Sequence, residues 1–255
     1  MIALAEGLEE TLVNTLLLLS ELDLAVDGAR PTDCPGWTVH DQVSHMVGLE
    51  QILAGAPEPA IDLPPFAHVA SDLDAYMERA VHVRRALPFV SVIDELTGML
   101  PRRLAQYREL IDQGDPEVLS PLGHYRPLSK ALPIRVFDLW IHEQDIRRAV
   151  GVAPRLSGVS SALVQDQILA AWQHRLPTRV ALDGQLRVSV GGAKPAKLEI
   201  TFGDGGQIGV LDLELDSLAR LACGRGERAE ILRNTTVAGS RELIDAVLDG
   251  AVITP

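Results

Sequence analysis

The spacing of apolar residues changes once along the chain, near Pro177, and this change limits the possible folds more than any other feature. Before it, apolar residues recur at helical spacing, as Leu8, Leu12 and Leu16 do, which predicts amphipathic helices. After it, short segments alternate apolar and polar residues between glycine-containing turns, a pattern typical of β-hairpins. We therefore expect a helical bundle over residues 1–176 and a small α+β domain over residues 177–255.

The expected elements follow from the same patterns and from the Pro- and Gly-rich stretches between them. In the first domain we expect helices at about 4–26, 38–54, 71–86, 90–113, 133–151 and 159–174. Thr38, with Asp41 three residues on, resembles a capping box at the start of the second helix. The segment 114–132 is expected to be a loop. In the second domain we expect strands at 179–182, 186–190, 197–202, 207–215 and 230–234, and short helices at 217–223 and 241–248.

Charge and cysteine content exclude several classes of protein. The formal net charge is -12 and the pI is about 5.0, so the chain as a whole repels phosphate backbones and a nucleic-acid partner is not expected. Cys34 and Cys223 are too few and too far apart for a secreted disulfide framework. The segment Met1–Glu6 lacks the basic start of a signal peptide, and the apolar run Leu12–Leu19 is too short to span a bilayer. We expect a cytoplasmic protein without a membrane partner.

Asp138 and His142 lie four residues apart in the fifth expected helix, so their side chains share one helical face. A carboxylate and an imidazole at this spacing can chelate one metal ion. The neighbours Phe137, Leu139 and Trp140 are apolar, so the helix is expected to be largely buried, and a buried carboxylate is costly unless it is paired or ligated. An Asp–His hydrogen bond that stabilises the helix is an equally good interpretation of this pair.

His45, in the second expected helix, changes that balance. Taken alone it is better interpreted as a core histidine with a satisfied hydrogen bond. Together with Asp138 and His142 it completes a set that suits zinc, nickel, iron or manganese. Three protein ligands leave one coordination position open, the arrangement of a catalytic site. Asp145 can hydrogen-bond a ligand or lie at the surface, and Glu143 is expected to lie at the surface.

Four other residues are candidates with structural alternatives. Trp37 and Trp140 can wall a cofactor pocket, although tryptophan at such places is more often part of the core. Arg225 can bind a substrate carboxylate as a catalytic residue, or it can be a surface arginine at a helix end. Cys34 is expected to serve packing. The chain has no Gly-rich phosphate loop in a strand–helix context and no Gly-x-Ser-x-Gly motif, so nucleotide cofactors and serine hydrolysis are not supported.

Three segments carry a resemblance to a known family. Two of them resemble the two signatures of the mycothiol-dependent maleylpyruvate isomerase family. They are the segment Asp33–Val39, which is followed by His45, and the segment Asp138–Arg147. The segment Leu218–Arg225 is similar to that family's C-terminal helix ending in Gly-Arg. The resemblance implies an actinobacterial type of protein with a DinB-like four-helix bundle, followed by a sterol-carrier-like α+β domain.

The resemblance also implies the ligands and the chemistry. His45, Asp138 and His142 match the positions that hold the metal in the family, which has Glu where this chain has Asp138. The open metal position receives a low-molecular-weight thiol, commonly mycothiol, and zinc is the first choice of ion. This implies a transferase or isomerase, monomeric or homodimeric, that acts on a small electrophilic substrate.

Two other functions stay open at this point. One is a non-catalytic metal- or lipid-binding protein, in which the sterol-carrier-like domain holds an apolar ligand. The other is a regulatory protein whose bundle docks a protein partner through an exposed apolar patch. The sequence does not decide whether the chain is an enzyme.

Overall fold

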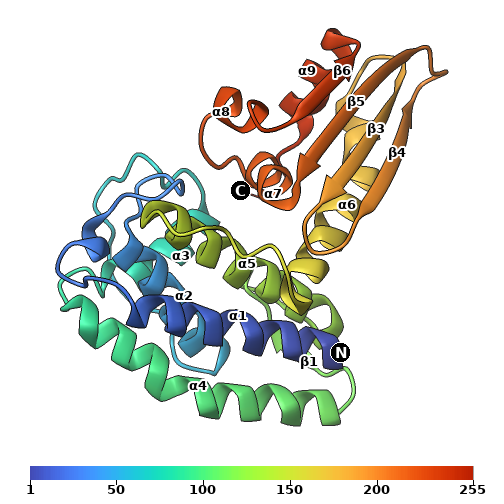
Figure 1. Ribbon diagram of the computed structural model, residues 1–255. Coiled ribbons are helices and arrows are strands. Elements are labelled where there is room, and N and C mark those ends of the chain that lie inside the picture. The colour runs from blue at the N-terminus through green and yellow to red at the C-terminus, as the bar shows by residue number, and fades with distance from the viewer. Residues whose placement is uncertain (255) are drawn as a thin grey trace. The chain divides into compact units, whose positions relative to one another are not determined.

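The computed structural model describes residues 1–254 and divides into two compact units, Met1–Pro154 and the chain from Arg155 onward (Figure 1). The sequence analysis set the boundary at residue 177, between the last expected bundle helix and the sheet. In the structure α6 (Val159–Arg179) falls within the second unit, where it packs against strand and helix elements of the α+β domain. The apolar face of α6 follows the same helical spacing as the bundle helices, so the pattern alone did not show which domain it joins.

The first unit is a four-helix bundle, as predicted. Its members are α1 (Ile2–Ser20), α2 (Val39–Leu53), α4 (Phe89–Asp112) and α5 (Leu128–Ala149). Both α1 and α2 pack against α4 and α5, and the shorter α3 (Asp72–His82) packs on α2. A 3-10 turn, η1 (Asp27–Ala29), lies between α1 and α2.

The start of α2 is the predicted capping box. The Thr38 hydroxyl accepts from the backbone N–H of Asp41, and the Asp41 carboxylate accepts from the backbone N–H of Thr38 at 2.9 Å. Two of the otherwise unpaired N–H groups of the helix end are satisfied in this way. Because α3, α4 and α5 all contact α2, most of its residues are buried, and the helix brings polar side chains into the core.

The structure corrects the segment 114–132, which was expected to be a loop. It holds a small antiparallel hairpin of β1 (Glu117–Leu119) and β2 (Tyr125–Pro127), and α5 begins at Leu128 rather than at Pro133. Leu128, Ala131 and Leu132 are buried at helical spacing. Their burial favours continuing the helix toward its N-terminus, with Pro133 inside it.

The second unit is a mixed sheet with helices packed on it. Its strands, in the spatial order β4-β3-β5-β6, are β3 (Gly184–Gly191), β4 (Ala196–Phe202), β5 (Gln207–Glu214) and β6 (Thr236–Gly239). The pairs β3–β4 and β5–β6 are antiparallel, and β3–β5 is parallel. The helices α6, α7 (Leu215–Cys223) and α9 (Arg241–Gly250) contact the strands. Alternate residues such as Leu186, Val188 and Val190 are buried on one face.

Two predicted strands are wrong. Arg179 ends α6 instead of opening a strand at 179–182, because Leu176 and Val180, four residues apart, are both buried. The segment 230–234 lies mainly in the short helix α8 (Arg228–Leu232). The edge strand is β6, which follows α8 and pairs with β5.

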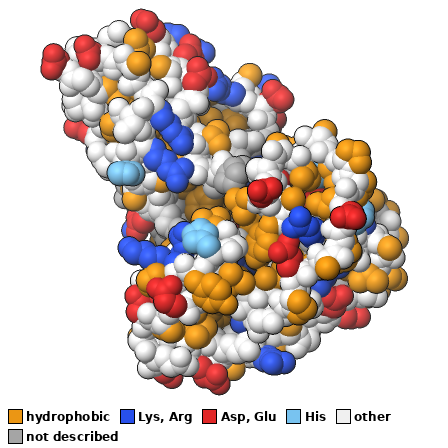
Figure 2. Space-filling model, turned by 180° about the vertical axis from the view of Figure 1, so that it is seen from behind, with side chains coloured by type: hydrophobic (Ala, Val, Ile, Leu, Met, Phe, Trp, Pro, Cys, Tyr) orange, Lys and Arg blue, Asp and Glu red, His pale blue; other side chains and the backbone are white. Residues whose placement is uncertain are grey.

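The surface carries charges of both signs. Figure 2 shows acidic and basic side chains interspersed among apolar and neutral ones on the face in view. None of the helices within residues 1–254 is long and apolar enough to cross a membrane.

The bundle core contains a buried ionic cluster of Glu50, Arg103, Tyr107 and Arg135, contributed by α2, α4 and α5. Glu50 accepts from Arg135 Nε at 2.6 Å and from Arg103 Nε at 2.8 Å, and Tyr107 donates to it at 3.1 Å. Burial raises the pKa of Glu50, but Arg135 and Arg103 outweigh this effect and hold the pKa below its usual range. Glu50 is therefore the ionised centre of this cluster.

We expect Glu50→Gln to lower the free energy of unfolding by about 3–5 kcal/mol, because it leaves two buried guanidinium groups without their shared carboxylate. The measurement is urea denaturation of the full chain, followed by helical circular dichroism. Glu58→Gln is the matched control, since Glu58 pairs with Arg79 at the surface with its side chain 39% exposed, and a change below about 1 kcal/mol is expected there. Equal losses in the two variants would contradict the prediction.

Candidate metal centre

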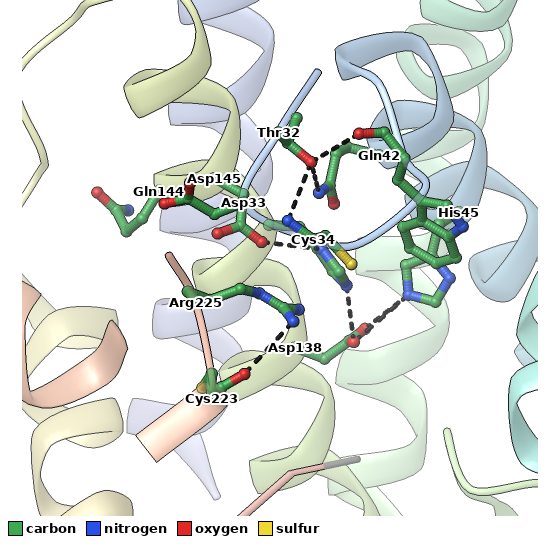
Figure 3. Close-up of polar contacts among 12 residues, drawn as sticks. Thr32, Asp33, Cys34, Gln42, His45, Asp138, Gln144, Asp145, Cys223 and Arg225 are labelled. Atoms are coloured by element: carbon green, nitrogen blue, oxygen red, sulfur yellow. Dashed lines mark hydrogen bonds and ion pairs between the residues drawn. The ribbon is translucent and has the colours of Figure 1, made fainter. Parts of the chain in front are cut away.

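The packing of α2 against α5 brings His45, Asp138 and His142 together. Asp138 Oδ1 lies 3.4 Å from His45 Nε2 and 3.2 Å from His142 Nε2. The two imidazole ring centroids are 4.6 Å apart. One donor atom from each of the three residues lies within 4.8 Å of the other two. The three residues thus lie together, as expected from the sequence, and their role as metal ligands stays a prediction. The contact of His45 with Asp138 is drawn in Figure 3.

This geometry and the donor types fit a divalent ion. Ligand atoms about 2.0–2.1 Å from one ion at the tetrahedral angle lie about 3.4 Å apart, close to the Asp138–histidine separations. The inward-facing nitrogen of each imidazole is Nε2. The other nitrogens, His45 Nδ1 and His142 Nδ1, are buried and have no hydrogen-bond partner among residues 1–254. Two imidazoles and a carboxylate are a donor set that zinc accepts.

Burial and charge give these residues the protonation states that metal binding needs. His45 is 1% exposed, and its burial, which outweighs the nearby Asp138 carboxylate, lowers the pKa of His45 to about 4. Burial would raise the pKa of Asp138, but His45, Arg135 and His142 act the other way and keep it well below its usual range. At neutral pH His45 is therefore a neutral imidazole and Asp138 a carboxylate.

Trp37 covers the two imidazoles. Its ring centroid lies 5.0 Å from that of His45 and 5.7 Å from that of His142. The indole N–H donates to Glu78 Oε2 at 2.9 Å, and Glu78 also pairs with Arg85 and His68. Trp37 thus lies directly beside two of the three candidate metal ligands, and its role in binding a cofactor stays a prediction.

The turn before α2 holds Trp37 in place. The Thr32 hydroxyl donates to the Trp37 carbonyl at 2.9 Å and accepts from Gln42 Nε2 at 2.8 Å and from the Cys34 N–H at 3.3 Å; Figure 3 shows Thr32 with Gln42 and Cys34. Gly36 has a φ of 75°, a conformation that favours glycine. Neither Cys34 nor Cys223 is in a disulfide.

Trp140 and Arg225 lie in different settings. Trp140 is completely buried in α5, two residues from both Asp138 and His142, so it projects about 200° around the helix from them. This placement fits the core alternative, and a cofactor role for Trp140 stays a prediction.

Arg225 belongs to the second unit, directly after the left-handed Gly224 that ends α7. Its Nη1 donates to the Cys223 carbonyl at 3.4 Å.

The two acids that follow His142 are both buried. Glu143, expected at the surface, is 0% exposed and pairs with Arg147 at 2.9 Å, so that expectation is wrong. Asp145 is also 0% exposed and pairs with Arg148. Its Oδ2 lies 3.8 Å from His142 Nδ1, which is too far for a hydrogen bond. Because both acids are i, i+3 or i, i+4 partners of arginines, burial is compensated by pairing.

Sequence reasoning missed two residues beside the site, Glu78 and Arg135. Glu78 is 0% exposed in α3 and reaches Trp37 only because α3 packs on α2, for which the sequence contains no signal. Arg135 Nη1 donates to Asp138 Oδ2. Its position three residues before Asp138 places it on the same helical face, and this spacing was available as a signal.

The fold and the site together define a class: an α-helical bundle with a candidate metal centre of two histidines and one aspartate, together with an α+β domain. Residues 8–147, more than half of the chain, match the family described as the mycothiol maleylpyruvate isomerase N-terminal domain. The chain belongs to this family.

Solved structures support the same fold. The crystal structure of the mycothiol-dependent maleylpyruvate isomerase is similar with a TM-score of 0.61 and 19% sequence identity, over 92% of this chain and 90% of that chain. A mutant of that isomerase, with a histidine replaced by alanine, gives a TM-score of 0.59 at 19% identity and the same coverage. A search of curated proteins found no matching sequence. The predicted combination of helical bundle and α+β domain is confirmed.

We expect His45→Ala, Asp138→Ala and His142→Ala each to abolish most of the divalent metal bound by the purified protein, because a three-ligand site loses a third of its donors. The measurement is elemental analysis after loading with zinc and desalting. His174→Ala is the control, since His174 is exposed on α6. Metal content at the wild-type level in all three variants would show that these residues are not the ligands.

We also expect the metal-free protein to lose stability as the pH falls from about 6.5 to 4. The unfolded chain protonates His45 near 6.5, whereas the folded chain does so only near the lowered pKa of about 4. The contribution of neutral His45 to the free energy of unfolding is therefore fully present well above pH 6.5. It is lost as the pH falls toward 4, and it amounts to about 3 kcal/mol for a shift of this size. Urea denaturation at several pH values measures the slope. His45→Gln should flatten it, and an unchanged slope in that variant would refute the assignment.

Proposed function

We propose that the chain is a metal-dependent enzyme that uses mycothiol, a low-molecular-weight thiol, as a transferase or isomerase on a small electrophilic substrate. The observation that carries this proposal is the cluster of His45, Asp138 and His142, which within residues 1–254 offers three donor atoms, all within 4.8 Å of one another. Such a set leaves a coordination position for a thiol or substrate. Family membership supports the choice of thiol, and the similar solved structure is described as mycothiol-dependent.

The chain's own residues prepare the site. His45 is neutral and Asp138 is ionised at neutral pH, so neither needs to lose a proton before it binds an ion. A divalent ion held there supplies Lewis-acid chemistry, which lowers the pKa of a thiol and favours the thiolate. Trp37 packs over both imidazoles and keeps water away from that side. We propose zinc as the ion, because two imidazoles and a carboxylate are donors it commonly takes.

The two candidate reactions share their first step. The thiolate sulfur bonds to an electrophilic carbon of the substrate. In an isomerase the sulfur adds to an activated double bond, the resulting single bond rotates, and the sulfur leaves again, so the thiol is regenerated. In a transferase the sulfur displaces a leaving group and stays in the product. A reducing compartment suits both reactions, because the thiol must stay unoxidised, and we place the protein in the cytoplasm as a monomer or homodimer.

Thiol-dependent turnover tests the proposal. Maleylpyruvate and a panel of small electrophiles are supplied to the zinc-loaded protein with mycothiol, glutathione or no thiol, and product is followed by mass spectrometry. We expect turnover with mycothiol alone among these conditions, and none in Asp138→Ala. Absence of turnover together with a tightly retained lipid would favour the non-catalytic binding protein instead.

Arg225 is proposed as a catalytic residue that binds a substrate carboxylate. Its guanidinium supplies paired donors that match a carboxylate. Losing a charge-assisted hydrogen bond of about 1.5–3 kcal/mol corresponds to about a 10- to 150-fold fall in kcat/KM for Arg225→Ala. Arg228→Ala is the control, since Arg228 is 45% exposed and pairs with Asp249 at 2.8 Å. Equal activity of Arg225→Ala and wild type would remove Arg225 from the reaction.

A further inference from the structure

Arg135 links the buried ionic cluster to the candidate metal centre. Its side chain is 1% exposed and uses all three nitrogens of the guanidinium. Nε donates to Glu50 at 2.6 Å, Nη2 donates to the Met46 carbonyl at 2.9 Å, and Nη1 donates to Asp138 Oδ2. Because two of these acceptors belong to α2, the guanidinium plane is fixed by a helix other than its own.

The two oxygens of Asp138 therefore have different surroundings. Oδ1 is the oxygen near both imidazoles, at 3.4 Å from His45 Nε2 and 3.2 Å from His142 Nε2. Oδ2 accepts from Arg135 and lies 3.4 Å from His45 Nε2. A cation that approaches Oδ2 must compete with a permanently charged guanidinium.

A purely stabilising role accounts poorly for this arrangement. Burying a guanidinium is expensive, and apolar residues of similar volume often give equal or greater stability. The Asp138 side chain is 21% exposed, so its pairing with Arg135 contributes less than a fully buried pair would.

We propose that Arg135 is a positioning residue that commits Asp138 to bind the ion through Oδ1 alone. This inference rests on the proposed function of the site. With Oδ2 held by Arg135, the carboxylate contributes one donor atom instead of two, and a coordination position stays open for the thiol. The guanidinium also withdraws negative charge from the carboxylate, which leaves the bound ion more electron-poor and a stronger Lewis acid.

Arg103 provides the matched control. It donates to the same Glu50 carboxylate from α4, at 2.8 Å, and is likewise buried, with its side chain 5% exposed. Its Nε donates to Glu50, its Nη1 donates to Gln106, and its guanidinium lies over the Tyr107 ring, so it is engaged away from Asp138. A substitution at Arg103 therefore disturbs the buried cluster without changing the proposed ligand.

The experiment compares the full chain with Arg135→Gln and Arg103→Gln, each loaded with cobalt(II), whose visible absorption is strong in four-coordinate sites and weak at higher coordination. We expect wild type and Arg103→Gln to show the same strong bands. Arg135→Gln should lose about half or more of the band intensity, because Asp138 becomes free to bind through both oxygens. The cobalt-to-protein ratio from elemental analysis confirms that each protein is fully loaded when its spectrum is recorded.

A second pair, Arg135→Lys and Arg103→Lys, keeps the buried positive charge and carries the test if a glutamine variant does not fold. Lysine at 135 retains a charge beside Glu50 but lacks the second arm for Asp138, so the same loss of intensity is expected at 135 only. Identical spectra at 135 and wild type, or equal changes at 135 and 103, would overturn the role of Arg135. A wild-type protein that binds no cobalt would overturn the proposed function itself, so the two failures are distinct.

Discussion

The contact between α2 and α5 at Asp138 is the interaction on which the candidate site depends. A carboxylate in this position is costly unless cations or polar hydrogens face it. Asp138 meets this requirement with two imidazoles and a guanidinium, of which only His45 comes from the other helix. The carboxylate thereby ties the position of α5 relative to α2 to the geometry of the donor set, so that fold and site are not independent.

Charge alternates along a line through the bundle core. Three ion pairs link four side chains whose charges alternate between positive and negative. In order they are Arg103, Glu50, Arg135 and Asp138. Before an ion binds, this line is neutral. A divalent ion at Asp138 would leave an excess of positive charge in a low-dielectric interior, and an anionic thiolate is the kind of partner that compensates it. The neutral set of core charges is therefore compatible with a cation that binds together with an anionic thiolate.

The sequence predicted the parts of the fold that depend on local pattern. The capping box at Thr38 and Asp41 and the bundle helices follow from spacing and turn chemistry. The start of α5, the placement of α6 and the edge strand β6 did not, because each is decided by which surface the segment packs against. Glu143 is a further case in which local pattern was not enough. Its charge suggested a surface position, but the ion pair with Arg147 offsets the cost of burying its carboxylate.

The sequence by itself determined that a carboxylate and an imidazole share a face of one helix. It also offered His45 on another helix as a third donor, a choice that the family resemblance supported. Spacing along a helix is a local property, so Asp138 and His142 were certain to be neighbours wherever α5 lay. Only the tertiary structure decided that His45 meets them, that Trp37 covers the imidazoles, and that Arg135 holds one oxygen of Asp138. The first two contacts join residues on different elements. Arg135 lies in α5 with Asp138, but its guanidinium is fixed by Glu50 and the Met46 carbonyl of α2, so packing of the bundle core sets this contact as well.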